Sequence, residues 1–244
     1  MDMPSSAADI SKRIRALADP VRAEGEARYF KTGPGQTGEG QKFLGLKTDD
    51  LRAIVRECWR ETPNDEILQL LASEFHEERA AALLIWVEKF KRCGETERGE
   101  ICTLYLANTT HIDNWALVDC SAEYIVGPWL EDKPRDILYS LARSPSLWER
   151  RIAIISTLHF IRRKDFADTL SLAKILLTDR EDLIHKATGW MLREVGKRDE
   201  AVLCGFLDEH AGVMPRTALR YAIERMEESE RQRYLTMGKR RTTA

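Results

Sequence analysis

The 244-residue sequence lacks several features that mark special classes of protein. No stretch approaches the roughly 20 consecutive apolar residues of a membrane-spanning helix, and the N-terminus has no long apolar run. The five cysteines are scattered, odd in number and form no Cys-x-x-Cys pair, which indicates reduced thiols rather than a disulfide framework. The sequence therefore favours a cytosolic protein.

Metal-ligand patterns and a strong charge of either sign are missing as well. The five histidines never pair at metal-ligand spacing, so no metal site is expected. A net charge of −2 argues against binding polyanions with the whole surface, but leaves a local basic groove possible. Basic residues are concentrated at 162–164 and toward the C-terminus, including a short tail at 238–244, and such runs are most often solvated faces.

Sustained strand alternation is absent, and almost the whole chain is predicted to be helical. The exception is the segment 32–40, where four glycines and Pro34 predict a flexible loop. Tryptophans 59, 86, 129 and 148 are expected in the core. Helices are predicted at 9–18, 20–31, 48–60, from 63, and at 76–92, 97–108, 113–130, 134–143, 147–162, 165–177, 181–197, 199–209, 214–226 and 228–237.

A helical segment recurs along the chain at a nearly constant interval. Its basic residue stands at Arg79, Arg151 and Lys186, at intervals of 72 and 35 residues, and Trp115 lies halfway across the longer interval. A period near 36 is typical of stacked helix pairs. With short connections between the helices, the sequence predicts an α-solenoid of about six antiparallel helix pairs in one domain, 1–244, whose concave face is the expected binding face.

Trp115 and Asp119 are four residues apart and so share one face of a helix. A carboxylate among Ala116, Leu117 and Val118 contributes nothing to helix propensity or capping, which favours a functional role. Asp119 could equally be a satisfied buried acid or the partner of an arginine.

A second stripe combines a tryptophan with positive charge. It consists of Lys186, Trp190, Arg193 and Lys197, and Arg151 is in register with Lys186 through the repeat. On a concave surface these groups would converge. The alternatives are that the tryptophan is a core residue and that Arg151 bridges adjacent repeats.

Several motifs in order resemble the AlkD-type DNA alkylation repair glycosylases over nearly the whole chain. The matching segments are Ala27-Arg28-Tyr29-Phe30-Lys31, Phe43-Leu44-Gly45-Leu46-Lys47-Thr48, Asn114-Trp115-x-x-Val118-Asp119, Trp148-x-x-Arg151 and Lys186-Ala187-x-Gly189-Trp190-x-Leu192-Arg193-Glu194. The resemblance implies an α-solenoid of HEAT-like repeats that excises cationic N3- and N7-alkylated purines from duplex DNA, without metal or cofactor and without flipping the base.

The same resemblance implies roles for individual residues. Asp119 would be the catalytic carboxylate, with Trp115 and Trp190 as aromatic walls. Arg151 and Arg193 would face the DNA backbone, and Tyr29 would line the same cleft. Lys186 and Lys197, which extend the same stripe, are also predicted to bind DNA. Two departures from the family pattern stand out: the loop 32–40 is longer and richer in glycine, and position 116 is alanine where an acid is common.

The alternative function is a non-catalytic HEAT-repeat scaffold that binds DNA or a protein partner. Retention of Trp115, Asp119, Arg151 and Trp190 favours the enzyme, and a monomer is expected because a solenoid of this length can close its own ends. No histidine or second acid falls in register with Asp119, and His185 is about 100° around its helix from Lys186. The sequence therefore predicts a preference for positively charged lesions over neutral ones.

Overall fold

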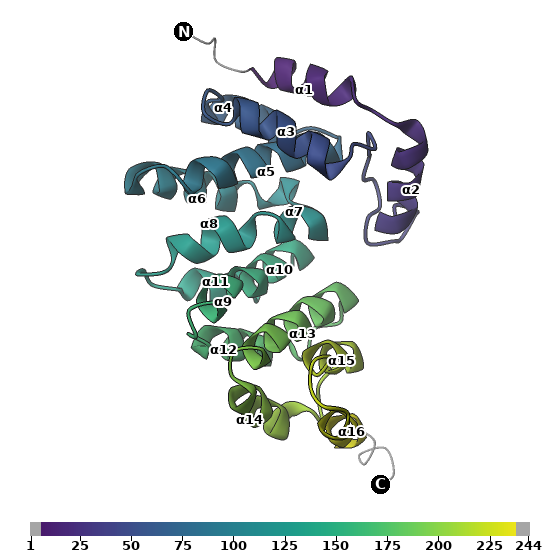
Figure 1. The fold of residues 1–244 in the computed structure, drawn as a ribbon, viewed down its shortest axis with the longest axis vertical. Coiled ribbons are helices and arrows are strands. Elements are labelled where there is room, and N and C mark those ends of the chain that lie inside the picture. The colour runs from purple at the N-terminus through teal and green to yellow at the C-terminus, as the bar shows by residue number, and fades with distance from the viewer. Residues whose placement is uncertain (1–5, 238–244) are drawn as a thin grey trace. The chain divides into compact units, whose positions relative to one another are not determined.

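The protein is helical throughout the part of the chain that the structure describes. The computed structural model describes residues 6–237, and the basic tail at 238–244 lies outside them. Over that range the only extended pairing is an isolated bridge between Lys42 and Phe75, which confirms the all-α class (Figure 1). The chain divides into two compact units, Met1–Ile125 and Val126–Ala244, and the boundary falls within α8 (Ala122–Trp129). Each unit is a stack of helices packed on their neighbours in sequence, as in an α-solenoid.

The first unit is built around α5 (His76–Phe90), which is buried on nearly every side. Its Trp86 is fully buried, as predicted, and the indole N–H donates to the side-chain oxygen of Asn64 at 3.1 Å. The helix α5 packs against α3 and α4, which lie to one side of it in Figure 1, and against α1, α6 and α7. The surrounding elements are α1 (Ala7–Arg15), α2 (Pro20–Phe30), α3 (Thr48–Cys58), α4 (Asn64–Leu71), α6 (Glu95–Ala107), the short 3-10 helix η1 (Thr109–His111) and α7 (Trp115–Asp119).

A buried glutamate closes the segment between α2 and α3. The Glu77 carboxylate accepts hydrogen bonds from the backbone N–H groups of Leu44, Gly45 and Leu46, at 2.6–3.3 Å. Gly45 has φ +82°, and a Cβ there would lie 2.3 Å from the carbonyl oxygen of Asp19. The Phe43-to-Thr48 motif is therefore a backbone cradle for a carboxylate, at a position that only glycine fits.

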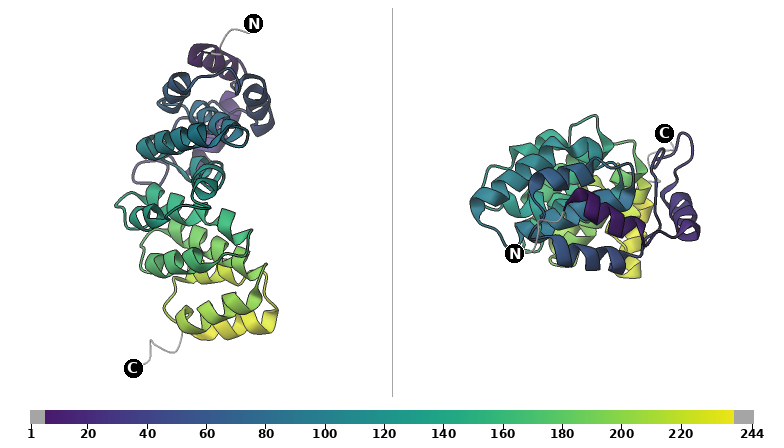
Figure 2. Two further views of the ribbon diagram at one scale, coloured as in Figure 1. Left: turned by 90° about the vertical axis from the view of Figure 1, so that its left-hand side faces the viewer. Right: turned by 90° about the horizontal axis from the view of Figure 1, so that it is seen from above.

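The second unit is built around α13 (Asp182–Gly196), which contacts α10, α11, α12, α14 and α15. Its core includes Leu192, Phe206, Leu219 and the fully buried Tyr234. Figure 2 shows these helices from two further directions. The elements of the unit after α8 are α9 (Asp136–Leu141), α10 (Leu147–Ser156), α11 (Leu158–Ile161), α12 (Ala167–Leu176), α14 (Glu200–His210), α15 (Arg216–Ala222) and α16 (Glu228–Met237).

Within each unit, polar side chains link one repeat to the next at intervals close to the sequence period. Sequence separations of 29 to 36 residues recur in these links. They are Asn64 with Glu100 and Arg79 with Asp113 in the first unit, and Arg135 with Asp165 and Asp168, Arg150 with Asp179, Arg163 with Glu131, Asp182 with Thr217 and Arg193 with Glu224 in the second. The predicted period near 36 is thus the interval at which one layer of helices bonds to the next.

Two predicted helices are interrupted. The predicted helix 113–130 is divided into α7 and α8, and the predicted helix 147–162 into α10 and α11. At the first break the Ser121 hydroxyl donates to the Leu117 carbonyl at 2.6 Å, and at the second the Thr157 hydroxyl donates to the Ile154 carbonyl at 2.7 Å. Such hydroxyls compete for the carbonyls of the preceding turn and bend or end a helix.

Gly189 on α13 provides a test of the tight packing against α15. A Cβ at this position would lie 2.4 Å from the Ala218 carbonyl oxygen, so Gly189→Ala should lower the free energy of unfolding by about 1–3 kcal/mol. Gly205→Ala is the matched control, because nothing lies within 4 Å of that Cβ in α14 and alanine should add about 0.5–1 kcal/mol. Urea unfolding of both variants measures the difference. Equal stabilities would contradict the close contact between α13 and α15.

Candidate functional site

Asn114 sets the start of α7, the five-residue helix that carries Trp115 and Asp119. Its side-chain oxygen accepts from the backbone N–H of Leu117 at 3.0 Å, a regular N-cap. Its amide nitrogen donates to the Gln41 side-chain oxygen and lies 3.0 Å from the Nδ1 of His76. Burial and the nearby positive charge of Arg79 lower the pKa of His76 to about 3, so the ring is neutral at neutral pH and Nδ1 can accept. The cap is therefore held from two other segments of the unit.

Arg79 completes this network on the opposite side of Gln41. One guanidinium nitrogen donates to the Gln41 side-chain oxygen and another to the Asp113 carboxylate, each at 2.5 Å. The Gln41 oxygen thus serves both Arg79 and Asn114. This ties the end of the glycine-rich loop to the residue that caps α7. The loop itself is closed by backbone hydrogen bonds, such as that from Gly38 to Lys31 at 3.1 Å.

The face of Trp115 is covered by aromatic rings from α2. Its indole stacks on Phe30 with centroids 4.9 Å apart and planes 10° apart, and Tyr29 meets it edge-on at 5.8 Å. Phe30 in turn packs on Phe43 and His76. Tyr29 remains 70% exposed. The structure brings Tyr29 and Trp115 together, and their roles toward DNA stay predictions.

Asp119 lies one turn beyond Trp115, at the last residue of α7, and is half-buried. Both residues line a cavity of about 800 Å³ within the first unit, between α3, α5, α7 and the start of α8. Burial, and after it the charge of Asp119, raise the pKa of the adjacent Cys120 thiol to about 12. Asp119 therefore imposes a negative field on its surroundings, and the neighbouring thiol stays protonated.

Five cations and two carboxylates line this cavity. The cations are Arg52, Arg56, Arg60, Lys91 and Arg92, and the carboxylates are Asp119 and Glu88. Burial alone would raise the pKa of Glu88, but hydrogen bonds from Lys91 and Arg92 hold that pKa below its ordinary value. Glu88 is thus paired with these two cations. Asp119 is the carboxylate at the Trp115 end of the cavity.

Tryptophans 59, 129 and 148 were expected in the core, and that prediction is wrong, because all three are only half-buried. Trp59 lines the cavity, where the guanidinium groups of Arg60 and Arg92 lie 5.0 and 4.8 Å from its ring centre. Trp59 is the residue next to the end of α3, and the sequence pattern did not show that this end opens on a cavity. Sequence reasoning also missed Gln41 and His76, which contact Asn114 although they are 73 and 38 residues away from it in the sequence.

The remaining predicted residues belong to the second unit. Arg151 is only 5% exposed and donates to the Leu183 carbonyl at 2.6 Å, so it links α10 to α13 as one of the sequence alternatives anticipated. Trp190 is half-buried on α13. Its role, and the DNA contact of Arg151, stay predictions.

The predicted stripe on α13 carries less uncompensated positive charge than the sequence indicates. Lys186 pairs with Asp182 at 2.8 Å, and that hydrogen bond raises the pKa of Lys186. Lys197 pairs with Glu194 at 2.6 Å, and Arg193 forms an ion pair with Glu224 of the next repeat. Asp182 and Glu194 lie about one turn from their partners, and Glu224 lies 31 residues from Arg193 in the sequence. Together these acids neutralise the positive charge of the stripe.

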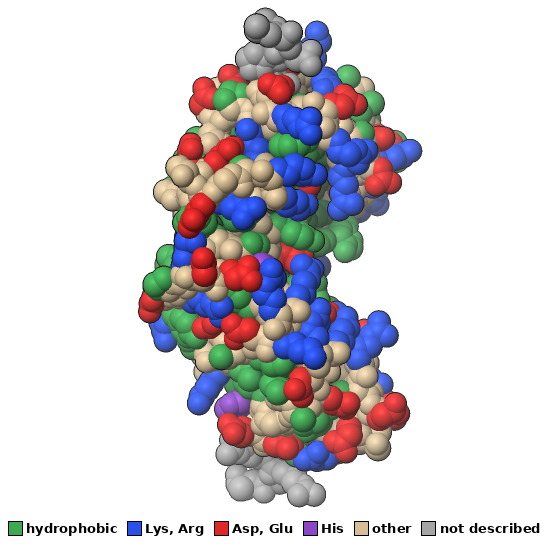
Figure 3. Space-filling model, turned by 60° about the vertical axis from the view of Figure 1, so that its left-hand side comes forward, with side chains coloured by type: hydrophobic (Ala, Val, Ile, Leu, Met, Phe, Trp, Pro, Cys, Tyr) green, Lys and Arg blue, Asp and Glu red, His purple; other side chains and the backbone are tan. Residues whose placement is uncertain are grey.

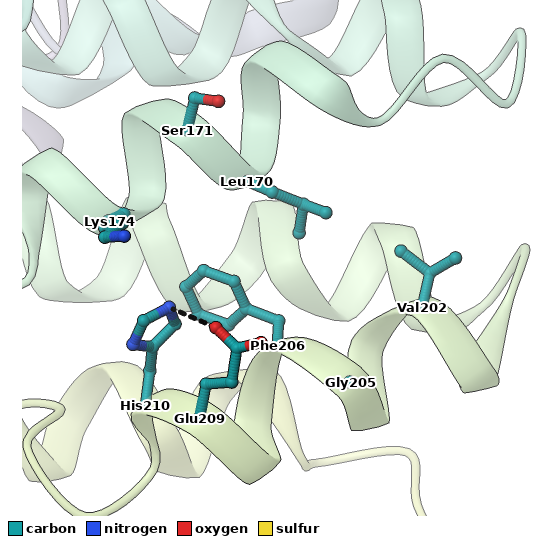
Figure 4. Close-up of a pocket in the computed structure, with 8 residues that line it drawn as sticks. All are labelled: Leu170, Ser171, Lys174, Val202, Gly205, Phe206, Glu209 and His210. Carbon is teal, nitrogen blue, oxygen red and sulfur yellow. Dashed lines mark ion pairs between the residues drawn. The ribbon is translucent and has the colours of Figure 1, made fainter.

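A smaller cavity of about 370 Å³ lies in the second unit between α12 and α14 (Figure 4). Phe206 and His210 meet edge-on there at 4.6 Å, and His210 lies 3.6 Å from the Glu209 carboxylate. The other lining residues are Leu170, Ser171, Lys174, Val202 and Gly205. None of the predicted site residues lines this cavity.

Across residues 6–237, no group of three or more histidine, cysteine or carboxylate side chains is arranged to hold a metal ion. None of the helices described is long and apolar enough to span a bilayer.

One comparison with known proteins identifies a family, and another identifies a similar fold. The model of the DNA alkylation repair enzyme family matches residues 10–226. A solved structure, described as a predicted DNA alkylation repair enzyme from Enterococcus faecalis, superposes with a TM-score of 0.67 at 17% identity, covering 87% of this chain and 98% of that one. At that identity the structural likeness shows the fold alone. No curated protein matches the sequence.

Gln41 provides a test of the network that holds α7. Gln41→Leu removes the acceptor shared by Arg79 and Asn114, and leaving part-buried donors unmet should lower the free energy of unfolding by about 1–3 kcal/mol. Gln41→Glu keeps an acceptor for both donors and should lose much less. Urea denaturation of the two variants tests this, and a Leu variant as stable as the Glu variant would remove Gln41 from the support of α7.

Proposed function

Because the chain belongs to the DNA alkylation repair enzyme family, we propose that it is a DNA glycosylase that initiates base excision repair. Its substrates are cationic N3- and N7-alkylated purines in duplex DNA, and its reaction is hydrolysis of the N-glycosidic bond. The observation that carries this proposal is the Asp119 carboxylate, one turn from Trp115 at the cation-lined cavity of the first unit.

The chemistry matches what a carboxylate and an aromatic ring can supply. When the C1′–N bond of an alkylated purine breaks, the bonding electrons go to the base, which leaves neutral, and the sugar becomes an oxocarbenium-like cation. Asp119 stabilises that cation and orients the water that adds to C1′, whose proton is released to solvent. The indole of Trp115 adds a cation–π attraction of about 0.5–2 kcal/mol.

Trp190 is proposed as a second aromatic contact with the damaged nucleotide, and the lesion stays stacked in the duplex. Backbone contacts are proposed for Tyr29, Arg151, Lys186, Arg193 and Lys197. Several of these cations are paired, but their partners Asp182 and Glu224 are 57% and 48% exposed. The Lys186–Asp182 pair is exposed at both ends, and such pairs contribute about 0–1 kcal/mol, so a DNA phosphate can take the place of Asp182.

The compartment and the oligomeric state are part of the proposal. All five cysteines are free thiols, which fits a reducing compartment such as the cytosol, where the nucleoid lies. We propose that the protein acts there as a monomer.

The deciding experiment is release of 7-methylguanine from alkylated duplex DNA by the purified protein. Release at a single-turnover rate above that of the DNA alone supports the glycosylase. Binding of the same DNA without release would favour the non-catalytic scaffold.

Asp119→Asn is expected to lower the single-turnover rate of 7-methylguanine release about 10²–10³-fold, because one preorganised charge at the reacting centre is lost. Affinity for duplex DNA should change little. Glu88→Gln is the control, since this second carboxylate of the cavity is already bound by Lys91 and Arg92. An Asn variant that retains the rate of the parent would exclude Asp119 from the mechanism.

Positively charged alkylpurines should be released, and neutral lesions such as uracil or 1,N6-ethenoadenine should not. A neutral base must be protonated as it leaves, and general-acid help is worth about 10²–10⁴ in rate. None of the described residues that line the cavity is a histidine. The Nε2 atom of His185, on α13, lies 2.7 Å from the Asp179 carbonyl oxygen. Single-turnover rates on both classes of lesion test this. Comparable rates on the two classes would show that a general acid protonates the leaving base.

A further inference from the structure

Three arginines form one wall of the cavity that contains Asp119. Arg52 and Arg56 are on α3 and Arg60 is in the turn that follows it, spaced four residues apart, and all three are exposed. Four residues of α-helix rise about 6 Å, so the three side chains start from points spread over about 12 Å. We call these three residues the arginine wall.

The arginine wall has no acidic partner, whereas five of the seven other arginines of its unit have one. Arg13, Arg15, Arg22, Arg79 and Arg92 each form an ion pair with a carboxylate. Across residues 6–237, no carboxylate lies at ion-pair distance from Arg52, Arg56 or Arg60. In a protein with a net charge of −2, three adjacent unpaired guanidiniums are a local concentration of positive charge. Figure 3 shows Lys and Arg side chains gathered on one edge of this unit.

The wall lines the same cavity as the Asp119 carboxylate, and one of its members rests on an aromatic ring. Arg60 lies over the Trp59 ring, which Arg92 contacts as well, and this limits the freedom of its guanidinium group. Arg52 stands at the other end of the wall. Burial raises the pKa of Cys120, the residue after Asp119, and the positive charge of Arg52 lowers that pKa by a smaller amount. A ligand bound along the wall therefore lies in the cavity that Asp119 and Trp115 also line.

We propose that the arginine wall binds consecutive phosphates of the DNA strand that carries the lesion. Guanidinium groups bind phosphate oxygens in a bidentate geometry, which makes arginine the preferred residue at such contacts. Consecutive phosphates of one strand lie roughly twice the axial rise of about 3.4 Å apart, because they also wind around the duplex, so about 12 Å of wall spans about three of them. The wall sets the position of the strand, and Asp119 then meets the sugar of the damaged nucleotide. This inference rests on the proposed function, for which it supplies the strand contact.

The test measures the salt dependence of binding to undamaged duplex DNA. Each phosphate contact contributes about 0.9 to the slope of log K against log salt concentration. Arg52→Gln, Arg56→Gln and Arg60→Gln should each reduce the slope by about that amount, and the triple variant by about 2–3, equally for unrelated sequences. Arg13→Gln is the matched control, because Arg13 is exposed, belongs to the same unit and is paired with Glu57. It should keep the parent slope.

Arg56→Lys separates charge from shape. Lysine retains the charge, so its slope should match that of the parent, whereas a slope as low as that of Arg56→Gln would overturn a phosphate contact at this position. Thermal unfolding of every variant checks folding, which these exposed positions should not affect. A triple variant that binds with the parent slope overturns the inference.

Undamaged DNA keeps this result independent of the chemistry. If the parent releases 7-methylguanine and the triple variant keeps the parent slope, the wall is wrong and the glycosylase stands. If the slope falls as expected and the parent releases no base, the strand contact stands and the glycosylase is wrong.

Discussion

The structure depends on each layer of helices being covered by the next. A single helix pair cannot bury its apolar faces. The helices α5 and α13 are buried because helices that precede and follow them in the sequence pack against them. Polar links at separations of 29 to 36 residues align these layers. Arginine dominates the links because its long stem crosses the apolar contact while its head group reaches an acid or a carbonyl in the next repeat.

The candidate site benefits from this layering. The helix α7 has five residues, far fewer than an isolated helix needs to be stable, so its position comes from tertiary contacts. Asn114 caps it, Gln41 and Arg79 brace the cap, and Phe30 stacks on Trp115. Asp119 is consequently held by groups from α2, the glycine-rich loop and α5. Such preorganisation is what a carboxylate requires if it is to stabilise charge in a transition state.

Much of the fold could be predicted from the sequence, because helical periodicity and short connections are local properties. The breaks at Ser121 and Thr157 escaped prediction because hydroxyl bonds to the preceding turn compete only weakly with helix formation. Trp115 and Asp119 could be paired by their spacing alone. The acids that neutralise Arg193 and Lys186, by contrast, are chosen by the packing of one repeat on another. The four-residue spacing of Arg52, Arg56 and Arg60 was readable, but their lack of acidic partners was not.

The helix α2 has no fully buried residue, although it supplies Tyr29 and Phe30 to the aromatic cluster. It protrudes from the rest of the first unit in the right-hand view of Figure 2. Its amide protons should therefore exchange with solvent through a local opening that costs far less than global unfolding. Each such opening would uncover the indole face of Trp115 while Asn114 still caps α7.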